Sequence, residues 1–104
     1  MAGNGLILVI DDEDIMREIL DVLLTREGYE VRLATDGADG IELARSMTFD
    51  AAIVDVMMPG MDGMAVLEEL KKLDDDLPVI MITAFASVEN AIAAMKRGAF
   101  DYIT

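Results

Sequence analysis

The sequence contains no cysteine, no histidine and no tryptophan, and only two of its 104 residues are proline. Without cysteine the chain can form neither disulfides nor thiolate metal sites, so nothing in it requires an oxidising compartment and we expect a cytoplasmic protein. Without histidine it has no imidazole metal ligand and no histidine acid or base. Any chemistry must therefore use carboxylates, hydroxyls, lysine, arginine or a bound metal.

Positive charge is also scarce, because eight Lys and Arg residues face 21 Asp and Glu residues, which gives a formal net charge of -13. Such a chain is repelled by phosphate backbones and by anionic lipid surfaces, so we expect no direct nucleic-acid partner and no membrane partner. No apolar run reaches the ~18 residues of a membrane span, and the first residues lack a basic leader segment. The length fits one domain, and a hydrophobic fraction of 54% supplies a core.

Short apolar runs of strand length alternate along the chain with segments of helical periodicity. This pattern predicts strands at residues 6–10, 29–34, 51–55, 78–83 and 100–104, and helices at residues 15–24, 38–47, 64–73 and 88–97. Gly28 is placed to end the first helix, and residues 62–63 to form the turn into the third. The alternation predicts an α/β fold with a parallel sheet. The third and fourth strands lack alternating polarity, which is typical of central strands covered on both faces.

Polar residues follow three of the predicted strands at the point where each strand ends. Asp11 and Asp12 follow the first strand, Asp55 closes the third and Thr83 closes the fourth. In a parallel sheet these ends meet at one edge, where ligands bind. Carboxylates gathered there at ~5 Å repel one another by a few kcal/mol per pair at an effective dielectric constant of about 20, so a cation is needed. Mg²⁺ suits such a site, and a free oxygen of Asp55 could then attack phosphorus and form an aspartyl phosphate.

Simpler interpretations exist for each of these residues. Taken alone, residues 11–14 are better explained as the N-terminal cap of the following helix. Asp55 has no such cap role, and its simpler interpretation is a turn-forming residue. Thr83 is also a good strand residue, and Tyr102 by default is a half-buried strand aromatic. The methionines between residues 57 and 64 indicate loop packing or an adaptable contact surface.

Four segments together carry a family resemblance: LILVIDDED (residues 6–14), IVDVMMPGMDG (53–63), MITAF (81–85) and GAFDYIT (98–104). In this order they resemble the signature blocks of response-regulator receiver domains, the phosphoacceptor modules of two-component signalling and phosphorelays. Residues 82–104 resemble in particular the receivers of nitrogen-regulation-type transcriptional activators. The resemblance implies a flavodoxin-like, doubly wound five-stranded parallel sheet in the order 2-1-3-4-5.

The resemblance also implies the roles of the acidic residues. Asp55 would accept a phosphoryl group from the phosphohistidine of a sensor histidine kinase. Asp11, Asp12, Asp55 and the backbone carbonyl of Met57 would bind Mg²⁺, for which Mn²⁺ could substitute. A domain of this kind is not an enzyme but a regulatory phosphoacceptor that assists its own phosphotransfer and dephosphorylation.

Two further residues would transmit the signal to an output domain or a downstream protein. The resemblance makes Thr83 the switch hydroxyl that closes on the phosphoryl group, and Tyr102 the aromatic that turns inward with it. We expect the loop after Thr83 and the helix from Val88 to move when Asp55 is modified.

The sequence departs from the family pattern after residue 104, where receivers continue with a Lys-Pro pair and a fifth helix. The resemblance therefore predicts that residues 1–104 form a C-terminally incomplete receiver domain with four helices. Lys71, Lys72 and Lys96 lie on predicted helices and do not replace the missing lysine. Strands three to five would be left uncovered on one face, which implies a fragment of a longer protein or a homo-oligomer that covers this face.

Two other functions remain open from the sequence. The same fold could act as a pseudo-receiver, an interaction module that works without phosphorylation. A haloacid-dehalogenase-like, Mg²⁺-dependent phosphatase is a second alternative, because Asp12 and Asp14 have the DxD spacing of that family's nucleophile. That family's following Thr is absent here, and the separate Asp55 segment fits a receiver better.

Overall fold

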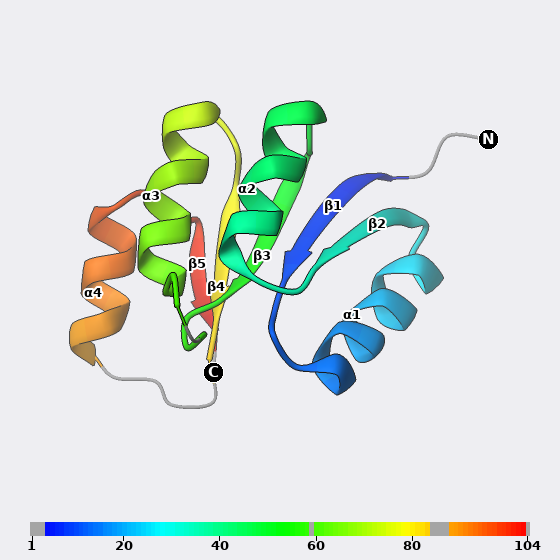
Figure 1. Cartoon of the computed structure of the whole chain (residues 1–104), viewed down its shortest axis with the longest axis horizontal. Helices are drawn as coiled ribbons and strands as arrows, with labels where there is room; N and C mark the ends of the chain where they lie inside the picture. Colours follow the sequence, from blue (N-terminus) through cyan, green and yellow to red (C-terminus); the bar gives the residue numbers. More distant parts are fainter. Residues whose placement is uncertain (1–3, 59, 84–87, 104) are drawn as a thin grey trace.

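The computed structural model describes residues 4–58, 60–83 and 88–103. In this part of the chain five strands alternate with four helices (Figure 1). In chain order the elements are β1 (Gly5–Ile10), α1 (Asp14–Arg26), β2 (Tyr29–Ala34), α2 (Gly37–Ser46), β3 (Ala51–Asp55), α3 (Gly63–Leu73), β4 (Val79–Ile82), α4 (Val88–Lys96) and β5 (Asp101–Ile103). Every predicted strand and helix is present. None of the described helices is both long and apolar enough to cross a membrane.

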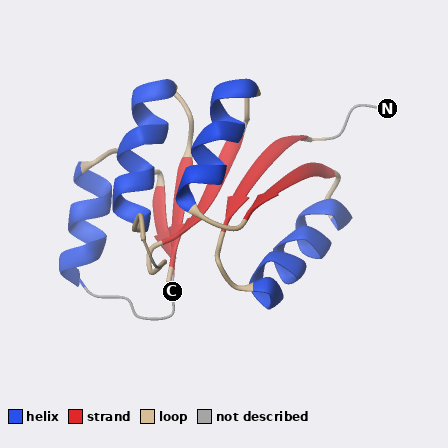
Figure 2. Cartoon of the chain, in the orientation of Figure 1, coloured by secondary structure: helices blue, strands red, loops and turns tan. Residues whose placement is uncertain are grey.

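All four strand pairings are parallel, and the order across the sheet is β2-β1-β3-β4-β5. Helices α2, α3 and α4 lie along one face of this sheet, whereas α1 lies on the other face beside β2 and β1 (Figures 1 and 2). The predicted flavodoxin-like fold and its strand order are therefore confirmed. The strand order changes direction between β1 and β3, so the carboxyl ends of these two strands flank the switch point, where ligands bind in such sheets.

The main core lies between the sheet and the three helices α2 to α4. Leu8, Ile10, Val54 and Met81 point to this side and are completely buried. Helix α2 approaches the sheet closely, because a Cβ added at Gly40 would lie 2.2 Å from Cδ1 of Ile10. Close packing of this kind fixes the positions of β1 and β3 and so the places where their polar ends emerge.

The opposite face is only partly covered in the described structure. Helix α1 has no buried residue, and several of its apolar side chains are exposed, among them Ile15 at 72% and Val22 at 54%. On the strands of the same face, Ile53, Ile80 and Ile82 are half-buried and Ile103 is 47% exposed. The expectation that this side of strands three to five lacks cover agrees with these exposures.

The element boundaries differ from the predicted ones by a few residues. Strand β4 ends at Ile82, so Thr83 lies one residue beyond the strand rather than in it. Asp62 caps α3, with its Oδ1 accepting the Ala65 N–H at 2.9 Å, as expected for the turn into that helix. Gly28 follows α1 with a φ of 94°, a conformation that favours glycine and ends the helix.

Candidate functional site

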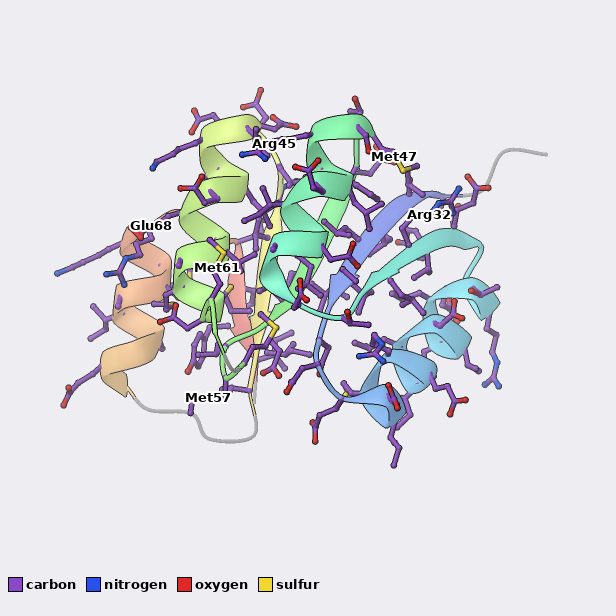
Figure 3. All side chains as sticks on the ribbon, viewed as in Figure 1. Arg32, Arg45, Met47, Met57, Met61 and Glu68 are labelled. Carbon is purple, nitrogen blue, oxygen red and sulfur yellow. The ribbon has the colours of Figure 1, made fainter. Side chains whose placement is uncertain are left out.

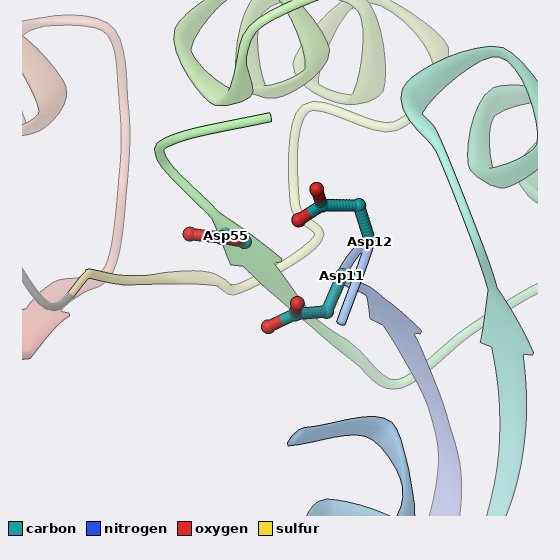
Figure 4. Close-up of side chains that lie close together, drawn as sticks. All are labelled: Asp11, Asp12 and Asp55. Carbon is teal, nitrogen blue, oxygen red and sulfur yellow. The ribbon is translucent and has the colours of Figure 1, made fainter. Parts of the chain in front are cut away.

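Three aspartates meet at the carboxyl ends of β1 and β3. Asp11 and Asp12 come from the end of β1 and Asp55 from the end of β3 (Figure 4). One carboxylate oxygen from each lies within 4.8 Å of the others. The convergence that the sequence predicted for these residues is therefore present in the structure.

Asp11 is the most deeply buried member of this acidic cluster, at 2% exposure. Its Oδ1 accepts the backbone N–H of Glu13 at 2.9 Å, and its own N–H donates to the carbonyl of Ala34 in β2 at 3.2 Å. Burial raises the pKa of the Asp11 carboxyl above its usual value, and the Glu13 N–H opposes this rise. The charges of Glu13 and Asp12 add to the rise, whereas the Arg17 guanidinium lowers the pKa.

Asp55 closes β3 at 9% exposure, and its Oδ1 accepts the backbone N–H of Met57 at 3.1 Å. Burial raises the pKa of the Asp55 carboxyl to about 6. The Met57 N–H works against this rise, while the nearby charges of Asp11 and Asp12 add to it. The ionised form of Asp55 is therefore costly in the protein alone and would be favoured by a neighbouring positive charge.

The cluster has the properties of a site for a hard divalent cation. Its donors are carboxylate oxygens only, which suit Mg²⁺, Mn²⁺ and Ca²⁺ rather than soft metals. At 4.8 Å two ionised carboxylates repel each other by about 3 kcal/mol at an effective dielectric constant of about 20. Asp12 is exposed, so the cluster is open to solvent on one side.

A cavity of about 290 Å³ lies beside the acidic cluster, between α1 and the ends of the strands. Asp11, Glu13, Asp55 and Thr83 contribute its polar lining, and apolar side chains of α1, β4 and β5 form the rest. Thr83 is 6% exposed, and its backbone N–H donates to the carbonyl of Ile103 in β5 at 3.1 Å. Thr83 thus lines the same cavity as Asp11 and Asp55, and a backbone hydrogen bond connects it to β5.

Tyr102 lies in β5 directly before Ile103, the residue that accepts the Thr83 N–H. The Tyr102 side chain packs against the main core, and its hydroxyl oxygen is buried with no hydrogen-bond partner in the described structure. Tyr102 is therefore half-buried, as expected for a strand aromatic, and its ring faces the main core. The predicted movement concerns α4 and the loop after Thr83, and residues 84–87 of that loop lie outside the described residues.

Asp14 lies outside the acidic cluster. Its side chain is 91% exposed and pairs with Arg17. The DxD pattern of Asp12 and Asp14, on which the phosphatase alternative depended, therefore does not form a shared site. The start of α1 also differs from the interpretation of residues 11–14 as a helix cap. The Glu13 side chain stands at the N-cap position but makes no cap hydrogen bond, and Asp11 accepts the Glu13 N–H instead.

Arg17 was not singled out by the sequence analysis. Its Nη1 donates to the carbonyl oxygen of Asp11 at 2.6 Å, and its Nη2 pairs with the Asp14 carboxylate. The six residues from Asp11 to Arg17 span the bend between β1 and α1, so no single helical or strand period relates the two positions. Only the folded connection brings the two residues together.

A doubly wound parallel sheet with an acidic cluster at its switch point defines an α/β protein whose carboxylate oxygens gather where ligands bind in such folds. The sequence matches the family model of the response regulator receiver domain over residues 7–104, and the chain belongs to this family. The resemblance stated from the four segments is thus confirmed. Receiver domains are regulatory modules of two-component signal transduction.

Individual relatives agree with this assignment. The chain is 45% identical over 97 residues to the transcriptional regulatory protein ZraR of Escherichia coli, which covers 93% of this chain but only 22% of ZraR. The chain thus spans about a fifth of the length of this relative. The crystal structure of the receiver domain of NtrX from Brucella abortus has a TM-score of 0.87 at 36% identity and covers 93% of this chain and 82% of that one. These two relatives agree with the resemblance to nitrogen-regulation-type activators.

A second similar structure bears on the acidic cluster. It is a response regulator from Burkholderia pseudomallei, crystallised with a phosphorylated aspartic acid, a calcium ion and citrate. Its TM-score is 0.91 at 31% identity, and the match covers 96% of this chain and 59% of that one. A modified aspartate and a divalent cation thus occur together in a protein of the same fold.

Proposed function

We propose that residues 1–104 form a receiver domain in which Asp55 accepts a phosphoryl group from a sensor histidine kinase in a Mg²⁺-dependent reaction. The observation that carries this proposal is the acidic cluster, in which a nearly buried aspartate of raised pKa lies beside two further carboxylates. A structural role would not require three repelling carboxylates at one strand edge.

The transfer forms one bond and breaks another. An oxygen of the Asp55 carboxylate attacks the phosphorus of the phosphohistidine, a P–O bond forms, and the electron pair of the broken P–N bond leaves with the imidazole. Asp55 Oδ1 accepts the Met57 N–H, so we expect Oδ2 to be the attacking atom. Burial of Asp55 at the end of β3 supports this direction, because it would restrict the orientations of the attacking carboxylate.

Asp11, Asp12, Asp55 and the backbone carbonyl of Met57 would hold the Mg²⁺, or Mn²⁺ in its place. The bound cation supplies positive charge that offsets the charges of the carboxylates and of the incoming phosphoryl oxygens. Asp11 and Asp12 keep this charge beside Asp55, and the cluster fits such an ion because its donors are all oxygens.

Thr83 and Tyr102 would convert the modification into a conformational change. The Thr83 hydroxyl would donate to a phosphoryl oxygen, and the bond from its N–H to Ile103 links any shift of Thr83 to β5. The inward position of Tyr102 in β5 supports its role as the aromatic member of the switch. The domain would thereby control an attached output domain or a downstream protein, in the cytoplasm and without binding nucleic acid itself.

The switch is tested by backbone amide exchange with and without Mg²⁺ and beryllium fluoride, a phosphoryl mimic. We expect slower exchange from Thr83 through α4 and in β5 of the wild type, and no change in Asp55→Asn. Asp75→Asn, which removes the same charge from an exposed loop, should respond as the wild type does. Unchanged exchange in the wild type would support the pseudo-receiver alternative instead.

A further inference from the structure

Arg17 is a cation placed next to a cluster that must itself attract cations. Although arginine side chains are mostly exposed in proteins, that of Arg17 is only 13% exposed. It lies in the first turns of α1, and its guanidinium bridges the Asp11 carbonyl oxygen and the Asp14 carboxylate. We propose that Arg17 is a positioning residue, which holds Asp11 in the orientation that cation binding requires. This inference rests on the proposed function of the acidic cluster.

The contacts of Asp11 explain why its orientation depends on Arg17. The Asp11 N–H donates a hydrogen bond to the Ala34 carbonyl of β2, its Oδ1 accepts one from the Glu13 N–H, and its carbonyl oxygen accepts one from Arg17. These three hydrogen bonds hold the bend between β1 and α1 in the conformation that places the carboxylate of Asp11 near that of Asp55. Without Arg17 the carbonyl of a residue that is 2% exposed loses a charged donor, and the bend must rearrange to regain one.

Charge and position predict opposite effects on cation binding, which makes the role of Arg17 testable. A guanidinium beside the cluster repels a divalent cation, so removing its charge alone would tighten Mg²⁺ binding. Loss of the bridge, in contrast, would release Asp11 and weaken binding. Lysine keeps the charge but lacks the planar fork that reaches both Asp11 and Asp14.

The experiment is a calorimetric measurement of the Mg²⁺ dissociation constant for the full chain and three variants, well below their melting temperatures. We expect Arg17→Gln and Arg17→Lys both to weaken binding by about tenfold, the lower end of the range for residues that orient metal ligands. Arg45→Gln is the matched control, because Arg45 forms an i,i+3 pair with Glu42 and lies at the end of α2 remote from Met57, the residue whose N–H donates to Asp55 (Figure 3). Its affinity should equal that of the wild type.

Two results would overturn the inference. Tighter binding by Arg17→Gln with unchanged binding by Arg17→Lys would mean that Arg17 acts through its charge alone. Equal affinities in all variants, even with lower melting temperatures, would leave Arg17 a purely structural role.

A wild type that binds no Mg²⁺ would instead contradict the proposed function, and the positioning role is then decided without metal. Amide exchange at Glu13, whose N–H donates to Asp11, should be faster in both Arg17 variants than in Arg45→Gln. Unchanged exchange there would overturn the inference independently of the metal.

Discussion

Replacing Asp55 with asparagine should stabilise the protein when no divalent cation is bound. Asparagine has the same shape and keeps an oxygen for the Met57 N–H, but it carries no charge. The rise in the Asp55 pKa from 3.8 to about 6 corresponds, at 1.36 kcal/mol per unit, to about 3 kcal/mol. Because Asp12 leaves the cluster open to solvent screening, we expect a gain in unfolding free energy of about 1–3 kcal/mol at about pH 7.5.

The sign of the pH dependence follows from the raised pKa. The folded state holds the Asp55 proton more tightly than the unfolded state, so the stabilising contribution is present below about pH 4 and is lost as the pH rises through about 6. The advantage of Asp55→Asn over the wild type should therefore grow between these two values and vanish below them.

The assay is urea unfolding followed by far-UV circular dichroism, in EDTA, across this pH range. Asp75→Asn is the control, since it removes the same charge from an exposed position outside the cluster and should change stability by less than about 0.5 kcal/mol. Saturating Mg²⁺ should stabilise the wild type by about 2.7 kcal/mol at a hundredfold excess over the dissociation constant, and Asp55→Asn much less. An Asp55→Asn protein that is no more stable than the wild type in EDTA at about pH 7.5 would refute this reasoning.

Two further predictions concern residues around the cluster. Tyr102→Phe should raise the unfolding free energy by about 1 kcal/mol, because it removes a buried hydroxyl that has no hydrogen-bond partner in the described structure. Tyr29→Phe, which removes no such group, is the control in the same denaturation assay. A loss of stability in Tyr102→Phe would show that the hydroxyl makes a hydrogen bond in the folded protein. Gly63→Ala should destabilise the fold by about 1–3 kcal/mol, because its Cβ would lie 2.2 Å from the carbonyl oxygen of Asp55, and should weaken Mg²⁺ binding by displacing that residue. An unchanged Mg²⁺ affinity in Gly63→Ala would separate the packing of α3 from the geometry of the cluster.

The fold was predictable because its elements carry strong local signals. The runs that became β1 and β3 are apolar until they end at an aspartate, and helix α3, which follows β3, begins at the capping residue Asp62. Convergence of Asp11, Asp12 and Asp55 then followed from the geometry of parallel strands, since the carboxyl ends of neighbouring strands meet at one edge.

The features that the sequence did not reveal depend on tertiary contacts. The link between Arg17 and Asp11 crosses a bend and has no periodic signature. Burial of the Tyr102 hydroxyl without a hydrogen-bond partner in the described structure depends on packing against the core, which the alternation of a three-residue strand cannot specify. The raised pKa of Asp55 likewise requires the burial and the neighbouring charges that only the fold supplies.

The most direct test of the account is intact mass and peptide mapping after incubation with Mg²⁺ and acetyl phosphate, in parallel with Asp55→Asn. We expect a hydroxylamine-sensitive phosphoryl adduct on Asp55 that forms only with Mg²⁺ and is absent from the variant. The lack of an adduct in a folded sample, or equal labelling of Asp55→Asn, would contradict the assignment of Asp55 as the phosphoacceptor.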